Sequence, residues 1–226
     1  AGICLHVRIP MDAWRQWIRH RTASVNEFST RYSPAIDEKD TTPAAEWRHQ
    51  SKGNRQGSSG SFVEAYPDEF EVPADVRELM DNGTPGEYLS VREHQLHEMA
   101  AEVYNERREF GVANEQARKD LPLSTYTEAY WTCNLHNLLH FLGLRMDSHA
   151  QKEIRDYANI IGNEFVAKLF PATWRAFCDY RLKALTLNAL DIEVLQRMMG
   201  RKRQNGDATI ATVADFMESQ HPAWQD

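Results

Sequence analysis

The segment that most constrains the fold is the first one. Over residues 2–9, apolar side chains alternate with polar ones, which is the period-two pattern of a half-buried strand. Pro10 then allows a helix to begin, and apolar residues follow at helical spacing, at Met11, Trp14, Trp17 and Ile18. The chain therefore opens with a strand that leads directly into a helix.

Most of the remaining chain has helical periodicity. The spacing of apolar residues predicts helices over 73–82, 86–110, 135–143, 148–170, 174–185, 192–199 and 213–219. A second strand is expected over 123–133, where Thr, Tyr and Trp are abundant. Because no repeat or linker interrupts the 226 residues, one α+β domain is predicted over 1–226, mostly helical around a small antiparallel sheet.

Local signals predict where two helices begin and end. Asn134 is expected to cap the helix after the second strand, and Gly143 to end it. Ser148 and Gln151 have the spacing of a capping box for the next helix.

The long helix over 86–110 is expected to serve packing rather than chemistry. His94 and His97 are expected on its solvent side. Its buried stripe is predicted at Tyr88, Val91, Leu96, Met99 and Val103.

Two polar stretches are predicted to be loops. Residues 22–33 have few apolar side chains and many that bond backbone groups, which indicates an ordered functional loop. Residues 52–60 are rich in Gly and Ser but lack the Gly-Lys-Ser/Thr ending of a phosphate-binding loop. A mobile surface loop is therefore predicted there, with a substrate-side role for 54–58 as an alternative.

The charge balance limits what the surface as a whole can attract. The net charge is -7 and the pI about 5.7, so an anion site must be built locally, and nucleic acid is a disfavoured partner. No apolar run approaches the ~20 residues that span a bilayer and no signal-peptide pattern is present, so a cytoplasmic protein without a membrane partner is expected. Widely spaced Cys4, Cys133 and Cys178 favour buried reduced thiols over disulfides or a zinc knuckle.

Residues 16–32 reverse the overall charge locally. They contain Arg19, His20, Arg21 and Arg31 among small polar residues, with the single carboxylate of Glu27. Guanidinium groups bind oxyanions bidentately, while hydroxyl, amide and carboxylate groups can orient a polar ring. The residues alone therefore predict a site for an anion and a ring.

Other reactive residues form weaker patterns. His136 and His140 share a helix face, but no third ligand accompanies them, so contact with a bound ligand is favoured and no metal is expected. Ser24 and Ser29 lie outside any Gly-x-Ser-x-Gly turn, so no covalent enzyme intermediate is expected. Arg145 lies between two helices, where a surface ion pair is the more usual role than catalysis.

Two blocks of the sequence resemble the flavin-dependent thymidylate synthases. The first, Arg-His-Arg-x-x-Ser-x-Asn-Glu-x-Ser-x-Arg-Tyr over 19–32, matches the signature of that family at every fixed position. The second comprises Ala117-Arg118, Leu121-Pro122 and much of 131–154. The match is weak after Pro171.

The resemblance implies a homotetramer of α+β subunits, with FAD and substrate sites where subunits meet. The implied reaction converts dUMP to dTMP without a cysteine nucleophile. Methylenetetrahydrofolate would donate the carbon, and FAD reduced by NADPH would donate the hydride. The flavin would carry the redox chemistry, and the protein would supply binding, orientation and electrostatics.

The resemblance also assigns residues by position. In related enzymes, the two parts of the first block serve one nucleotide from different subunits. Arg145 matches the arginine beside the uracil ring that favours its N3-ionised form, so it is the predicted catalytic residue. Ser29, Arg31 and Arg118 are expected near the phosphate. Positions that match dUMP contacts are Gln16, Trp17, Ile18, Arg19, Glu27, Phe28, Ser29, Thr30, Arg31, Arg118 and Arg145. Positions that match FAD contacts are Arg19, His20, Arg21, Glu27, Asn134, Leu135, His136 and His140.

Two departures from the family pattern bear on flavin binding. His136 stands where some members have Arg, which would make attraction to an FAD phosphate depend on pH. The family also has an N-terminal segment with flavin and substrate contacts, which is not found ahead of the first strand. A truncated chain is the expectation, and a non-catalytic nucleotide-binding protein that has lost flavin is the alternative.

Overall fold

The structure is a computed structural model, and it describes residues 2–29, 38–53 and 57–204, with the backbone alone for 197–204. The chain divides into two compact units, Ala1–Leu182 and Lys183–Asp226. The second unit contains α9 (Ala189–Gln204), which includes the helix predicted over 192–199. The helix predicted over 213–219 lies outside the described residues. A single domain over 1–226 stays a prediction.

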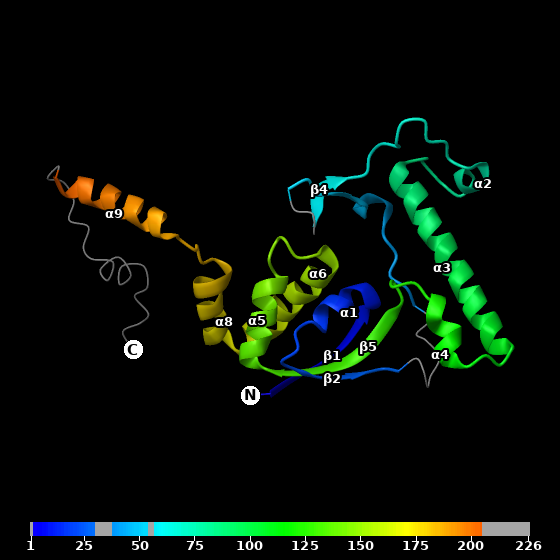
Figure 1. Cartoon of the computed structure of the whole chain (residues 1–226), viewed down its shortest axis with the longest axis horizontal. Coiled ribbons are helices and arrows are strands. Elements are labelled where there is room, and N and C mark those ends of the chain that lie inside the picture. Colours follow the sequence, from blue (N-terminus) through cyan, green and yellow to red (C-terminus); the bar gives the residue numbers. More distant parts are fainter. Residues whose placement is uncertain (1, 30–37, 54–56, 205–226) are drawn as a thin grey trace. The chain divides into compact units, whose positions relative to one another are not determined.

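The first unit is built on a three-stranded antiparallel sheet in the order β1-β5-β2 (Figure 1). β1 (Gly2–Pro10) pairs along its whole length with the central strand β5 (Tyr126–Asn134). β2 (Ser24–Glu27) pairs with the other edge of β5. The two predicted strands are therefore direct partners, and the predicted α+β class is confirmed.

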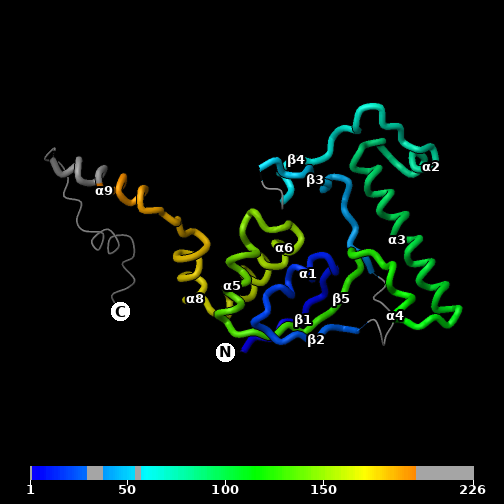
Figure 2. Tube along the Cα trace, in the orientation of Figure 1, coloured from blue at the N-terminus to red at the C-terminus, as the bar shows by residue number. Residues whose placement is uncertain are grey.

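One face of this sheet carries the core. It is covered by α1 (Met11–Trp17), α5 (Leu135–Arg145) and α6 (Lys152–Ile160), as the tube in Figure 2 also shows. The ring centroid of Trp17 lies 4.5 Å from that of Phe141 and 5.7 Å from that of Trp131. The fully buried side chains of this core include Trp14, Trp17, Trp131, Phe141, Ile9, Leu138, Leu142 and Ile154. These aromatic contacts hold the end of α1 against β5 and α5.

The long helix α3 (Pro85–Glu109) buries a different face from the predicted one. Leu96 and Met99 are 59% and 64% exposed, whereas His97 is buried and its Nε2 lies 2.7 Å from Ser124 Oγ. The solvent-side position predicted for His97 is therefore wrong. The reason is that α3 packs on polar turns, η1 (Ala44–Glu46) and η2 (Arg118–Asp120), and not on the apolar core.

Both stretches predicted as loops contain strands. β2 lies within 22–33, and because it is an edge strand with four exposed residues, no alternation of burial marks it. β3 (Arg48–Gln50) and β4 (Ser58–Phe62) form a hairpin, so 52–60 connects two strands and includes the first residues of β4. Residues 54–56 of the alternative substrate-side loop lie outside the described residues.

The predicted helix ends are partly correct. Asn134 caps α5, because its Oδ1 accepts the Asn137 N–H at 2.9 Å. α5 passes through Gly143 and ends at Arg145. The capping box predicted at Ser148 is wrong, since Gln151 is the N-cap of α6 and its side chain makes no cap hydrogen bond.

The remaining helical elements complete the first unit. The helix predicted over 73–82 shortens to α2, and the continuation of α6 is irregular. The bounds are α2 (Ala74–Arg77), α4 (Asn114–Ala117), η3 (Ile161–Val166), α7 (Ala167–Leu169), α8 (Pro171–Phe177) and η4 (Cys178–Leu182). Across the described residues, no helix has the length and apolar character needed to cross a bilayer.

The cysteines differ in exposure from the prediction. All three are free, but Cys4 is exposed, Cys133 is buried and Cys178 is half-buried. Cys4 lies on the uncovered face of β1, where period-two alternation turns its side chain away from the core. Burial raises the pKa of the Cys133 thiol to about 11, so the buried thiol is a structural residue and not a nucleophile.

Candidate functional site

The predicted site residues gather in two separate pockets of the first unit. The first pocket lies where the chain leaves α1 and meets α5, and has a volume of about 370 Å³. It is lined by Arg19, His20, Arg21, Thr22, Trp131, Asn137, His140, Leu144 and Arg145. Residues far apart in the sequence thus bring three guanidinium groups and two imidazoles together.

The turn after α1 places the signature residues at this pocket. The N–H groups of Arg19 and His20 bond back to the carbonyls of Gln16 and Trp17, at 3.3 and 3.0 Å. Trp17 is fully buried, so the turn starts from a fixed point. The ring of His20 then packs edge-on against Phe141, with 4.9 Å between centroids.

Arg145 is held by this turn. Its Nε donates to His20 Nε2 at 3.0 Å, and its Nη2 donates to the carbonyl of Gln16 at 3.3 Å. Since Nε2 of His20 accepts a hydrogen bond, the ring proton of the neutral imidazole is on Nδ1. Arg145 is therefore not the solvated surface residue that its place between two helices suggested.

The electrostatics of the pocket keep His20 neutral. Burial, then the charge of Arg145 and then His140, lower the pKa of His20 to about 4. Burial also lowers the pKa of Arg145, but a guanidinium remains protonated in proteins. The pocket thus presents a fixed cation, Arg145, beside a neutral imidazole.

The second pocket lies beside β2 and the turn after α4, and has a volume of about 600 Å³. Glu27, Phe28, Ser29 and Arg118 line it together with Lys119. Pairing with β5 fixes the position of β2 beside this pocket. The Phe28 N–H extends the pairing by donating to the Glu128 carbonyl at 2.8 Å. Three of the residues predicted to bind dUMP thus lie beside Arg118.

Glu27 is oriented by a buried neighbour on β5. Thr127 is 3% exposed, and its Oγ1 donates to Glu27 Oε1 at 3.0 Å. A carboxylate held by one oxygen keeps the other available as an acceptor. The second pocket thus combines an oriented acceptor with the cation of Arg118.

Several predicted residues line neither pocket. Thr30 and Arg31 lie outside the described residues. The side chain of Trp17 is in the core, so this residue can reach a ligand only through its main chain. Five further predicted residues are absent from the linings of both pockets, namely Gln16, Ile18, Asn134, Leu135 and His136.

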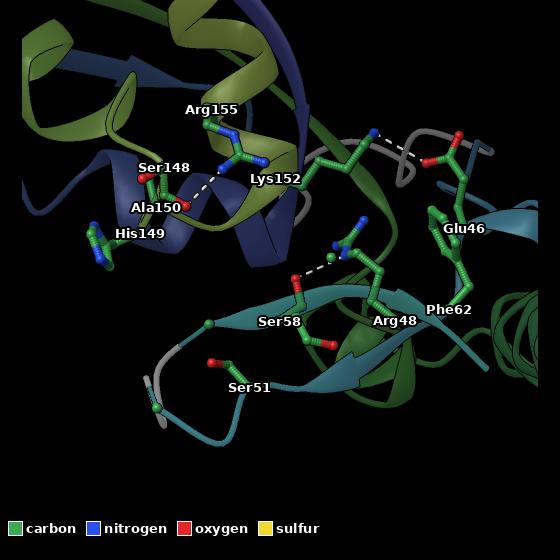
Figure 3. A pocket seen from close by; sticks show the side chains of 14 residues that line it. Glu46, Arg48, Ser51, Ser58, Phe62, Ser148, His149, Ala150, Lys152 and Arg155 are labelled. Carbon is green, nitrogen blue, oxygen red and sulfur yellow. Dashed lines mark hydrogen bonds and ion pairs between the residues drawn. The ribbon is translucent and has the colours of Figure 1, made fainter.

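A third cavity, of about 810 Å³, lies between the β3–β4 hairpin and the start of α6 (Figure 3). Figure 3 shows Arg155 and Lys152 on one side and Arg48 on the other. Arg48 pairs with Glu153 at 2.7 Å, and Lys152 with Glu46 at 3.1 Å. Arg155 donates to the Ser148 carbonyl at 2.8 Å. Because all three cations already have partners, we assign Arg48 and Lys152 to holding β3 and η1 on α6, and Arg155 to the turn before α6.

Some residues of the two pockets were not predicted as site residues. Trp131 and Leu144 supply an apolar wall to the first pocket, and Asn137 and Thr22 add polar groups. Asn137 could have been found from its place three residues after the cap Asn134, which puts both at the start of α5. Thr127 reads as an ordinary strand residue.

The donor groups of the first pocket suit part of a dinucleotide. Guanidinium groups bind phosphate oxyanions, and a neutral imidazole and an apolar wall suit a ring system. No metal site is indicated, since the described residues contain no group of three His, Cys, Asp or Glu placed to hold an ion. The structure thus defines the class of protein. It is an α+β protein with two polar pockets beside one sheet, and both pockets contain cationic side chains.

Comparison with known proteins identifies the family. The family model described as thymidylate synthase complementing protein matches residues 1–172. A flavin-dependent thymidylate synthase of Dictyostelium discoideum is 43% identical over 191 residues, which is 84% of this chain and 56% of the relative. The protein of the same name from Wolbachia pipientis wMel is 38% identical over 200 residues, covering 87% of this chain and 62% of the relative. This chain therefore belongs to the flavin-dependent thymidylate synthase family, and it spans about 60% of the length of these relatives.

A solved structure is similar as well. The UMP/dUMP methylase PolB from Streptomyces cacaoi, bound with 5-Br UMP, superposes with a TM-score of 0.61 at 31% identity. The similarity covers 80% of this chain and 74% of that one. The resemblance seen in the sequence is thus confirmed at the level of family and fold.

Proposed function

We propose that the protein to which this chain belongs is a flavin-dependent thymidylate synthase that methylates dUMP to dTMP. Methylenetetrahydrofolate would donate the carbon, and NADPH would reduce the FAD. The observation that carries the proposal is the first pocket, where signature residues 19–21 converge on Arg145. The names of the curated relatives and of the dUMP-binding structural neighbour support it.

In this proposal the first pocket holds the reacting ring. Arg145 is fixed by His20 and by the Gln16 carbonyl, so its charge needs no reorganisation when negative charge develops on uracil. Arg19 and Arg21 are expected to bind the FAD phosphates, with His20 and His140 beside the flavin. Bound FAD supplies the hydride, and the protein residues bind, orient and polarise.

The second pocket is assigned to the nucleotide phosphate. Ser29 and Arg118 supply a hydroxyl and a cation, and Glu27 an oriented acceptor. Because one chain keeps the two pockets apart, we propose that a complete site forms where two subunits meet, in a homotetramer. A cytoplasmic location stays a prediction.

The test is turnover by the full-length protein. We expect dTMP from dUMP only when methylenetetrahydrofolate and NADPH are both present, together with a flavin spectrum. Tight dUMP binding without flavin and without turnover would instead select the non-catalytic nucleotide-binding alternative.

A further inference from the structure

A chain of side-chain hydrogen bonds joins the end of α1 to the start of α6. The amide nitrogen of Gln16 donates to Oε1 of Gln151, and the amide nitrogen of Gln151 donates to Oδ2 of Asp12 at 3.2 Å. Gln151 also bonds the carboxylate of Glu153. Glu153 is itself held by Arg48, one of the residues drawn in Figure 3.

Two carboxylates fix the direction of this chain. An ionised carboxylate accepts hydrogen bonds and donates none. Gln151 must therefore turn its NH₂ group to Asp12 and Glu153, which leaves its oxygen for Gln16. Gln16 in turn must donate with its NH₂ group, so its own Oε1 points away from Gln151.

Hydrogen bonds keep the carboxylate of Glu153 charged despite its burial. Burial by itself would raise the pKa of Glu153, but hydrogen bonds from Arg48, from its own N–H and from Gln151 lower it below the ordinary value. Glu153 is therefore charged near neutral pH and acts only as an acceptor. The donor-to-acceptor direction of all these hydrogen bonds is therefore set by the protein before any ligand binds.

Gln16 is left with one free acceptor. Among the described residues, its Oε1 has no protein partner, and the side chain is only half-buried, so solvent reaches it. The main-chain oxygen of the same residue accepts from Arg145 at 3.3 Å. Gln16 is thus held at both ends, beside the guanidinium that the proposed function places at the uracil ring.

We propose that Gln151 is a positioning residue that fixes the amide of Gln16, so that Oε1 is presented to the nucleotide as a hydrogen-bond acceptor. The inference rests on the proposed function, because it takes dUMP as the ligand of Gln16. The matching donor on dUMP is its ring N–H or its sugar hydroxyl.

A double-mutant cycle tests this role in the full-length protein loaded with FAD. Calorimetry measures dUMP binding to Gln151→Met, Gln16→Met and the double variant. Each single change is expected to raise Kd about three- to ten-fold, the loss of one hydrogen bond, and the double variant to bind no worse than Gln16→Met. Gln95→Met on α3 is the matched control with unchanged Kd, since the one hydrogen bond of its side chain to another described residue is from Arg92, at 2.8 Å, on the same helix.

Two analogues identify the donor. The 3-methyl analogue of dUMP lacks the ring N–H, and the 2′,3′-dideoxy analogue lacks the sugar hydroxyl. One of them should bind the wild-type protein more weakly than dUMP, and Gln151→Met should abolish that difference. A purely structural role of Gln151 would leave the difference intact.

Further outcomes contradict the inference. Losses that add in the double variant would show that Gln151 does not act through Gln16. A folded Gln151→Met protein with wild-type Kd would show that it does not act at all. If Gln151→Met fails to fold, Asp12→Asn is the second variant: Asn has the size of Asp but can also donate, so it no longer forces one orientation of the Gln151 amide. If Asp12→Asn leaves the preference between dUMP and both analogues unchanged, the role of Gln151 is refuted. A wild-type protein that binds no dUMP would overturn the proposed function itself, and the inference with it.

Discussion

Nε of Arg145 donates a hydrogen bond to Nε2 of His20 at 3.0 Å, although the two residues are 125 positions apart in the sequence. The bond requires a neutral imidazole, and burial together with the charge of Arg145 lowers the pKa of His20 to about 4. The middle residue of the Arg-His-Arg signature therefore orients the predicted catalytic arginine. This gives the signature histidine a role beyond the flavin contact that the family resemblance predicts.

Substitution of His20 should separate acceptor geometry from charge. His20→Gln can place an amide oxygen near the Nε2 position, whereas His20→Leu cannot. We expect His20→Leu to lower kcat/KM about three- to ten-fold, as one hydrogen bond would, and His20→Gln to lose less. Steady-state kinetics with a flavin spectrum of each variant checks this, and equal losses would refute the orienting role.

The low pKa of His20 also predicts how stability depends on pH. The unfolded chain takes up a proton near pH 6.5, but folded His20 does so only near pH 4. The unfolded state therefore binds more protons in this window, and stability falls as pH is lowered through it. In denaturant titrations, His20→Gln should lose less stability than wild type between these pH values.

His97 shares the sign of this effect and must be kept constant. Burial lowers the pKa of His97 too, and both proteins in the comparison retain it. The difference in unfolding free energy between wild type and His20→Gln should be constant above about pH 6.5, the upper end of the pH window. A difference that does not change across the window would contradict a neutral His20.

The two pockets should differ in their effects on chemistry and binding. Arg145→Lys keeps the charge but loses the planar donor fork, so we expect kcat to fall about 100-fold with dUMP binding largely retained. Arg118→Ala should instead raise the Kd of dUMP about 10- to 100-fold, because it removes a charged donor. Calorimetry and turnover measured on both variants distinguish these effects, and identical patterns would refute the division of roles.

Mixing these variants tests whether subunits share a site. If Arg145 and Arg118 of different subunits serve one nucleotide, mixed oligomers of the two variants should convert dUMP at low concentration faster than either parent. A mixture no more active than its parents would place both residues in one chain.

Two helical glycines give a matched stability test. A Cβ at Gly86 would collide with the main-chain oxygen of Ala44, whereas a Cβ at Gly143 would lie 3.7 Å from the ring of Phe177. We expect Gly86→Ala to cost about 1–3 kcal/mol of unfolding free energy, as overpacking does. Gly143→Ala should be neutral or gain up to about 1 kcal/mol from helix propensity. Urea titration of both variants checks the contrast, which equal effects would contradict.

The elements of the core could be predicted from the sequence because their buried apolar residues recur with the period of a strand or a helix. The alternation over 2–9 predicted β1, and the stripe with Trp14 and Trp17 predicted α1, since both face one apolar core. The same reasoning failed for α3, where His97 is buried against Ser124 and Leu96 is exposed. On a helix that packs on polar turns, the apolar residues do not mark the buried face.

The site was predictable as a motif but not as a geometry. The signature named Arg19, His20 and Arg21, yet nothing local to residue 20 indicates its bond to Arg145. Gln151 was predicted only as part of a capping box, because its partners, Gln16 and Asp12, lie on another helix more than a hundred residues earlier. Long-range polar contacts depend on register and packing, which composition and periodicity do not encode.

The most direct test of the proposed function follows the flavin of the full-length protein through one turnover without oxygen. NADPH should bleach the visible flavin absorbance, and dUMP with methylenetetrahydrofolate should restore it with formation of an equal amount of dTMP. A protein that carries no flavin, or whose reduced flavin is not reoxidised by the two substrates together, would contradict the account.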